Sequence, residues 1–125
     1  MMVGVYTASG GLSTAEDVEK MLRQCIDQPI STLAKWIVRR SIVILQWRMK
    51  TFLPLFQFDL RDMSLRPEPS AVVRELTSAF DDWELACWFS EPNSWLRGER
   101  PVERIGVDFA EVLMAARADR FVALG

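Results

Sequence analysis

Apolar side chains recur at helical spacing in two neighbouring segments of the N-terminal half. The first segment holds Val18, Met21, Leu22 and Cys25, which share one face of a helix because about 3.6 residues make a turn. The second segment follows Pro29 and repeats this pattern over residues 30–37. A proline between them ends the first helix, since it fixes φ and restricts the preceding residue. The pattern predicts two short helices joined by a tight turn.

Residues 42–56 change to β-branched and aromatic types, which favour strands. Two runs of this character, 42–47 and 52–56, are separated by Arg48, Met49 and Lys50. We interpret the runs as a β-hairpin with a basic tip. Pro54 lacks a backbone N–H, so the second strand is expected to lie at a sheet edge or to contain a bulge.

The C-terminal half has helical patterns separated by proline. Residues 60–69 contain Pro67 and Pro69 without periodicity and are expected to be a connection, while helices are expected over 69–80, 83–89 and 108–124. Pro101 fits the first position of another short helix. Acidic or hydroxyl residues stand three positions before a glutamate at several predicted helix starts, the spacing of a capping box. These pairs are Ser13 and Glu16, Asp81 and Glu84, and Asp108 and Glu111.

These elements together predict a mainly α protein with one small β-hairpin, in which a helix-turn-helix plus wing is followed by a small helical bundle. Residues 1–12, including Tyr6, are expected to form a flexible N-terminal tail. Residues 13–59 form the winged helix-turn-helix-like module, and residues 60–125 form a helical domain.

Composition limits the chemistry that this chain can perform. It has no histidine and two distant cysteines, Cys25 and Cys87, which removes the common zinc sites and the Ser/His and Cys/His nucleophile pairs. Both thiols fall on apolar helical faces and are expected to be inert and buried. The acids Asp81, Asp82 and Glu84 are explained as helix caps. We expect neither an enzyme nor a bound metal or cofactor.

The chain has no apolar run near the roughly 18 residues that cross a membrane, and residues 1–11 lack the pattern of a secretory signal. We therefore expect a cytoplasmic protein without a membrane partner.

Charge is distributed unevenly although the net charge is only −2. Residues 28–58 carry five bases and no acid, whereas twelve acids face eight bases from residue 61 onward. An acid-free basic segment on a helix-turn-helix indicates contact with DNA phosphates and base edges, although basic helix faces are also common as solvated surface. The candidate DNA-binding residues are Thr32, Lys35, Trp36, Arg39, Arg40, Arg48 and Lys50.

The first half resembles small excisionase-like and MerR-like DNA-binding modules. Glycines that such modules place after the second helix and at the wing tip are replaced here by residues 39–41 and by Met49-Lys50. The positions that match are Thr14, Glu16, Val18, Leu22, Leu33, Trp36, Ile37, Val43, Arg48 and Pro54.

The acidic half concentrates tryptophan, with Trp83, Trp88 and Trp95 close together before a polar turn. These rings either form a core or leave an exposed remainder as an interface, where tryptophan and arginine are favoured anchors. The candidate partner-binding residues are Trp88, Asn93, Trp95, Arg97 and Arg100.

The stretches "LFQFD" and "PNSWLRGERP" resemble the C-terminal domain of Xre/MbcA/ParS-type antitoxins. Arg97 stands where glycine is usual in that family. The matching positions are Phe56, Gln57, Phe58, Asp59, Trp83, Trp88, Phe89, Pro92, Asn93, Trp95, Leu96, Gly98, Arg100, Pro101, Val112, Ala115 and Ala116.

The resemblance implies an antitoxin that binds and blocks a RES-domain toxin, an NAD-consuming enzyme, and that represses its own operon by binding operator DNA as a homodimer. Two other interpretations stay open: a small DNA-binding transcriptional regulator without a toxin partner, and a protein that only binds another protein through its tryptophan-rich half.

Overall fold

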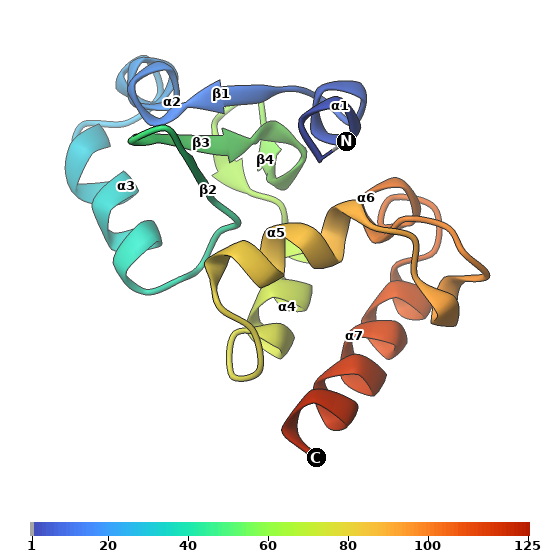
Figure 1. Ribbon diagram of the computed structural model, residues 1–125. Helices are drawn as coiled ribbons and strands as arrows, with labels where there is room; N and C mark the ends of the chain where they lie inside the picture. The colour runs from blue at the N-terminus through green and yellow to red at the C-terminus, as the bar shows by residue number, and fades with distance from the viewer. Residues whose placement is uncertain (1) are drawn as a thin grey trace.

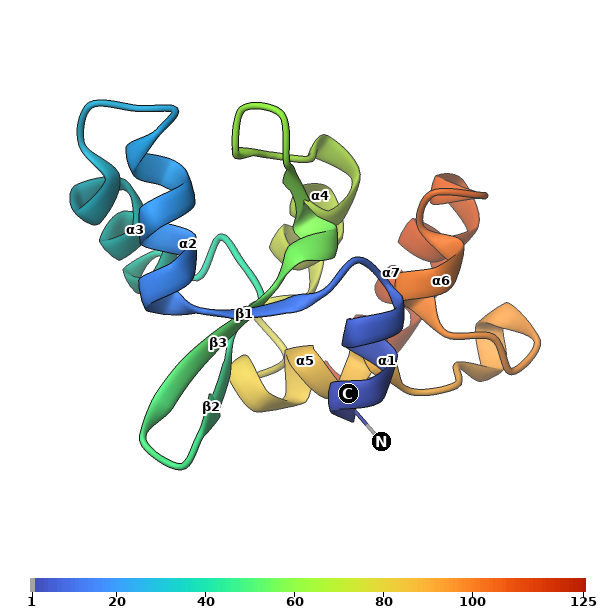
Figure 2. The same ribbon diagram turned by 90° about the horizontal axis from the view of Figure 1, so that it is seen from above.

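The computed structural model describes residues 2–125 and has the predicted fold class, mainly helical with a small antiparallel sheet (Figure 1). The first half contains α1 (Met2–Ala8), β1 (Leu12–Thr14), α2 (Ala15–Arg23), α3 (Pro29–Val38), β2 (Leu45–Trp47) and β3 (Lys50–Pro54). The strands pair in the order β1-β3-β2. Figure 2 shows the β2–β3 hairpin projecting to one side of β1, while α2, α3 and α4 lie on the other side.

The hairpin turn consists of Arg48 and Met49, whose φ values are 50° and 64°. Two successive left-handed residues give the turn that matches the twist of a two-residue hairpin. The prediction that Pro54 marks an edge strand or a bulge was wrong, because β3 is the central strand. Pro54 is its last residue and lies opposite Leu12, so the missing N–H falls where the strand ends. The N–H of Leu55 then donates to the carbonyl of Gly11 at 2.9 Å.

The N-terminal segment is a helix where the sequence predicted a flexible tail. Tyr6 of α1 is 1% exposed, stacks on Phe56 with ring centroids 6.0 Å apart, and donates its hydroxyl hydrogen to the carbonyl of Ala86 at 2.6 Å. This contact joins residues 80 positions apart, which explains why local periodicity could not reveal it. Only residue 1 of the predicted tail lies outside the described residues.

The second half is helical, with two short elements that sequence periodicity did not predict. Strands β4 (Phe58–Asp59) and β5 (Ser64–Leu65) form a small hairpin inside the expected connection. The full order is η1 (Leu55–Gln57), β4, β5, α4 (Pro67–Leu76), α5 (Asp82–Ser90), η2 (Ser94–Leu96), α6 (Pro101–Arg104) and α7 (Phe109–Leu124). None of the described helices is both long and apolar enough to span a membrane.

Two apolar clusters form the interior, and their boundary differs from the predicted one at residue 59. The helix-turn-helix cluster contains Val18, Leu22, Leu33, Ile42, Ile44, Leu53, Phe58 and Met63. The larger cluster joins the C-terminal helices to α1, β2 and η1, through Tyr6, Leu45 and Phe56. Leu53, Phe56 and Phe58 thus alternate between the two clusters, so that residues 52–58 belong to both halves of the molecule.

Two of the three predicted helix caps are present in the structure. Asp81 accepts from the N–H of Glu84, and Glu84 returns a bond to the N–H of Asp81, as a capping box. Asp108 accepts from the N–H of Glu111. The expected box at Ser13 is wrong: Ser13 lies in β1, and Thr14 caps α2. Cys25 is exposed and Cys87 partly buried, which corrects the expectation of two buried thiols.

Candidate DNA-binding and partner-binding surfaces

A groove between α3 and α4 gathers part of the predicted DNA-binding set. It has a volume of about 350 Å³, and no acidic side chain is among the described residues that line it. We call it the basic groove. Its lining consists of Thr32, Lys35, Trp36, Arg39, Ser41, Leu65, Ser70 and Arg74.

The cations of the basic groove are unpaired within the described residues. Lys35, Arg39 and Arg74 make no ion pair there, although eight such pairs occur elsewhere among residues 2–125. Three like charges around one depression raise a positive potential, which attracts anions. Hydroxyl groups of Thr32, Ser41 and Ser70 are of the type that donates to phosphate oxygens.

Trp36 is half-buried at this groove and also belongs to the interior. Its ring lies 5.8 Å from that of Phe58, centroid to centroid, and it packs against the helix-turn-helix cluster. The indole therefore both supports the fold and lines the groove.

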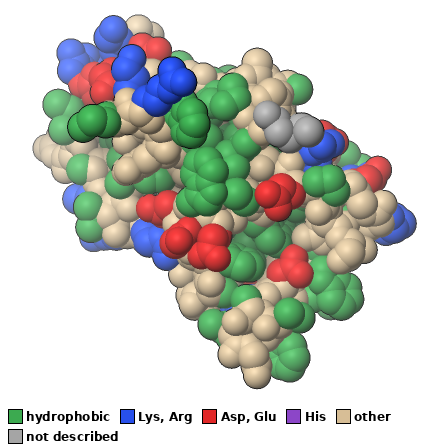
Figure 3. Space-filling model, viewed as in Figure 1, with side chains coloured by type: hydrophobic (Ala, Val, Ile, Leu, Met, Phe, Trp, Pro, Cys, Tyr) green, Lys and Arg blue, Asp and Glu red, His purple; other side chains and the backbone are tan. Residues whose placement is uncertain are grey.

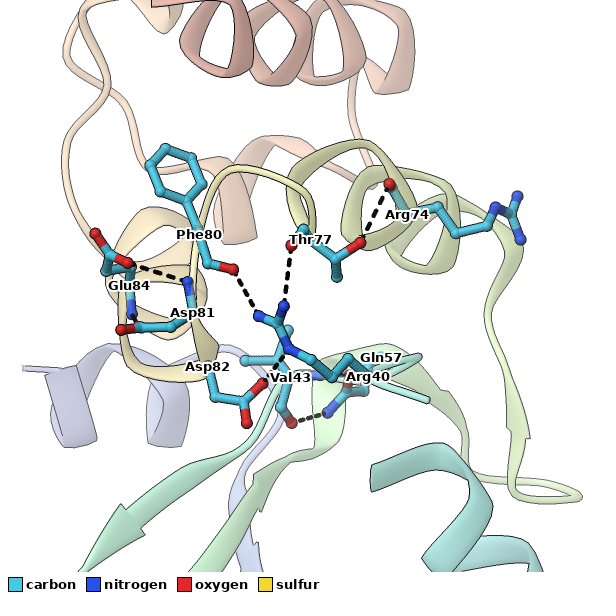
Figure 4. A network of polar contacts seen from close by, with 9 residues as sticks. All are labelled: Arg40, Val43, Gln57, Arg74, Thr77, Phe80, Asp81, Asp82 and Glu84. Atoms are coloured by element: carbon cyan, nitrogen blue, oxygen red, sulfur yellow. Dashed lines mark hydrogen bonds and ion pairs between the residues drawn. The ribbon is translucent and has the colours of Figure 1, made fainter. Parts of the chain in front are cut away.

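Arg40 does not belong to the predicted DNA-binding surface, because its side chain turns inward toward the C-terminal half (Figure 4). Its guanidinium donates to Asp82 Oδ1 at 3.0 Å, to the carbonyl of Thr77 at 2.9 Å and to that of Phe80 at 2.6 Å. Figure 4 shows Arg74 extending away from this cluster. We call the Arg40 contacts the arginine clamp. It ties the end of α3 to the loop between α4 and α5.

The backbone at Arg40 explains why the clamp forms there. The N–H of Ser41 bonds to the carbonyl of Trp36, and that of Arg40 to the carbonyl of Ile37, which is the Schellman pattern at a helix end. Its C′ residue is left-handed, and Arg40 has φ 55°. Glycine is favoured at this position. Here the arginine accepts the strained backbone, and its side chain reaches three acceptors.

Arg48 and Lys50 lie at the exposed hairpin tip. They are separated from the basic groove because the hairpin projects on the opposite side of β1 from α3 and α4 (Figure 2). The Arg48 guanidinium lies 5.7 Å from the Trp47 ring centroid, a distance at which a cation–π contact holds. The predicted DNA-binding residues thus form two separate basic patches, the basic groove and the hairpin tip, instead of one continuous surface.

Trp88, Asn93 and Trp95 converge on one carboxylate in α7. Asp119 Oδ2 accepts from Trp88 Nε1 at 2.7 Å and from Asn93 Nδ2 at 2.9 Å. Asp119 Oδ1 accepts from Trp95 Nε1 at 2.9 Å. We call this arrangement the Asp119 knot. It fastens the "PNSWLRG" turn to the last helix.

Burial separates the predicted partner-binding residues into two groups. Trp88 and Asn93 are 8% and 7% exposed, so they hold the fold and cannot serve as surface contacts, which corrects their prediction. Trp95 is 54% exposed, and its bond to Asp119 fixes the orientation of the ring. Arg97 pairs with Glu111 at 2.7 Å, and the Arg100 Nε donates to the carbonyl of Ser90.

An apolar groove of about 380 Å³ lies between α1, the sheet and α5. Figure 3 shows hydrophobic side chains gathered in the middle of this face, with acidic side chains beside them over the start of α5. Trp47 and Trp83 stand at its rim, 56% and 49% exposed. The lining is Met2, Val3, Leu12, Leu45, Trp47, Phe52 and Trp83.

Sequence reasoning missed three residues that these sites depend on. Arg74 and Ser70 lie in a predicted helix with no motif around them. Asp119 follows Ala115 and Ala116, which match the antitoxin family, but it was not singled out, because its three donors come from residues 24 to 31 positions away. The acid-free segment at 28–58 predicted the basic side of the groove, but nothing local indicated that α4 would complete it.

Comparison of the chain with protein-family models, with curated proteins and with solved structures gives no match in any of the three.

Proposed function

We propose that the chain is an antitoxin-like regulator that binds DNA through its helix-turn-helix half and a RES-domain toxin through its tryptophan-rich half. In this proposal it acts by binding and has no catalytic role of its own. The observation that carries the proposal is the basic groove beside α3, in a chain whose net charge is −2.

The DNA-binding part rests on topology together with charge. A helix-turn-helix places its second helix against the major groove, and α3 is the second helix of the pair here. Lys35 and Arg39 are exposed and unpaired within the described residues, so they are available to phosphates or base edges. Arg48 and Lys50 on the hairpin offer a second phosphate contact.

The backbone supports the likeness to the two families at the positions where the sequence departs from them. Arg40, Met49 and Arg97 replace glycines of the resembled motifs, and their φ values are 55°, 64° and 60°. These are left-handed conformations that glycine favours. At these three positions the chain therefore has the backbone conformation that a glycine would favour.

The partner-binding part rests on Trp95. A half-exposed indole that is held by a hydrogen bond loses little conformational entropy on binding, which suits an anchor residue. The neighbouring helix α7 adds exposed apolar side chains, Phe121 and Val122 at 78% and 68%. We assign the toxin to this end of the molecule.

The toxin assignment is tested by co-expressing the chain with a RES-domain protein and measuring co-purification and NAD depletion. Trp95→Ala should weaken the complex by about 2 kcal/mol, as loss of an anchor does. Trp83→Ala is the matched control, since this indole is similarly exposed, 49% against 54%, but lies at the apolar groove. Equal affinity of the Trp95→Ala and unmodified chains would refute the assignment.

The DNA-binding part is tested with a labelled mixed-sequence duplex at low and moderate salt. The double charge reversal Lys35→Glu and Arg39→Glu should abolish retention and leave toxin binding intact. Loss of both activities together would contradict a division of labour between the two halves.

A DNA-binding regulator without a toxin is the second candidate. It is favoured by the burial of Trp88 and Asn93, since most of the motif that resembles antitoxins then serves the fold. Duplex binding without any complex with a RES-domain protein would decide for this alternative.

A further inference from the structure

We infer that the DNA contact is composite: Arg74 and Ser70 of α4, outside the helix-turn-helix, bind the same phosphate backbone as Lys35 and Arg39 of α3. This inference rests on the proposed DNA-binding function. The two sides of the basic groove, formed by α3 and by α4, are its two walls. The α4 wall comes from the half of the chain that was expected to bind only protein.

The two walls belong to one groove. Arg74 is exposed and lines the depression together with Lys35 and Arg39, and its guanidinium has no ion-pair partner within residues 2–125. By contrast, Glu75 beside it pairs with Arg117 and Arg120 of α7. The neighbouring acid is thereby engaged on another face of α4, and the positive potential of the groove is left uncancelled.

The arginine clamp holds the two walls in register. Arg40 at the end of α3 bonds to the carbonyl of Thr77, which directly follows α4, and to Asp82 at the start of α5. Because the clamp fixes the end of one wall to the end of the other, the spacing between Lys35 or Arg39 and Arg74 is set before any ligand binds. A backbone that is already fixed need not be ordered when the cations that it carries engage an anion, which reduces the entropy lost on binding.

The lining chemistry fits phosphates of a duplex better than an acidic peptide. Hydroxyl groups of Thr32, Ser41 and Ser70 line the groove together with the cations, a combination typical of phosphate contacts. Leu65 and Trp36 are the two apolar residues among the eight that line the groove, so most of the lining residues are cations or carry hydroxyls.

The test measures how duplex affinity falls with salt, using a fluorescein-labelled mixed-sequence duplex and the full chain. Each phosphate contact contributes nearly one to the slope of log K against log salt. Lys35→Gln and Arg74→Gln should each lower the steepness of that slope by about one. Lys20→Gln, which removes one positive charge from an exposed position of α2 that does not line the groove, should leave it unchanged. Circular dichroism checks that each variant is folded.

The outcomes separate the inference from the function on which it rests. If Lys35→Gln reduces the slope while Arg74→Gln equals the unmodified chain, the composite groove is overturned and DNA binding stands. If the unmodified chain retains no duplex even at low salt, both are overturned. If Arg74→Gln leaves duplex binding intact but weakens binding of a poly-glutamate peptide, the groove belongs to an acidic protein partner instead.

Discussion

Asp119 is the residue on which the tryptophan-rich turn depends, because three N–H donors end on its two oxygens. Asp119→Asn would place an amide NH₂ among those donors and leave at least one of them unsatisfied. Hydrogen bonds to a charged group are worth about 1.5–3 kcal/mol, so we expect a loss of about 2 kcal/mol in the free energy of unfolding. Urea unfolding measures it.

A matched control is Asp108→Asn, the same chemical change at the cap of α7. Asparagine caps helices as well as aspartate does, so this variant should retain the stability of the unmodified chain. Equal stability of the two variants would mean that the Asp119 knot contributes nothing beyond one ordinary polar contact.

Tyr6 should make the protein less stable at high pH. Burial raises its pKa well above the usual value, with a further contribution from Cys87. The neutral ring is therefore favoured in the fold, and its contribution is present below the unfolded pKa of about 10 and lost as the pH rises above it.

The chain has one tyrosine, so the ultraviolet absorbance of tyrosinate reports on Tyr6 alone. We expect the signal to appear only when the protein unfolds at alkaline pH, whereas the chain in concentrated urea should titrate near pH 10. Titration of the folded protein near pH 10 would show that the ring is not enclosed.

Replacing two left-handed residues with glycine should change stability in opposite directions. Met49 is fully exposed at the hairpin tip, so Met49→Gly relieves backbone strain and should stabilise the protein by about 0.5 kcal/mol. Arg40→Gly relieves the same strain but removes the arginine clamp, whose charged hydrogen bonds are worth more. It should destabilise the protein by about 1 kcal/mol.

Thermal unfolding of these two variants side by side gives the comparison. Opposite signs are the expected result. A stabilised Arg40→Gly variant would indicate that the clamp is energetically neutral and that the left-handed backbone dominates at both positions.

Elements were predictable where their signal is local. The apolar spacing at 18–25 and 30–37 and the caps at Asp81 and Asp108 depend on neighbours in sequence, and the structure has those helices. Helix α1, the third strand β1 and the Arg74 wall were not predictable, because each is stabilised by partners dozens of residues away. The inward turn of Arg40 belongs to the same group, since an arginine in an acid-free run gives no local sign of its distant acceptors.

At the scale of the whole molecule, residues 52–58 should make the two halves unfold together. Phe56 contributes to the larger cluster, while Leu53 and Phe58 on either side contribute to the helix-turn-helix cluster. Loss of one cluster therefore disorders the segment that the other needs, which predicts one cooperative transition.

Leu22→Ala and Leu85→Ala test this coupling, since each removes a fully buried leucine from a different cluster. Each should lower stability by about 3 kcal/mol and shift tryptophan fluorescence and far-ultraviolet circular dichroism along the same curve. An early separate phase after Leu22→Ala would mean that the halves are independent domains.

The docking of α1 has a consequence for how the chain assembles during translation. Tyr6 is synthesised 80 residues before Ala86, the residue to which it bonds. The helix-turn-helix cluster, whose buried members end at Met63, is fully synthesised when Phe56 is the only one of the two Tyr6 partners, Phe56 and Ala86, that is present. If folding proceeds from the N-terminus, α1 cannot complete its docking until α5 has been synthesised. Until then the apolar face around Tyr6 is accessible to chaperones.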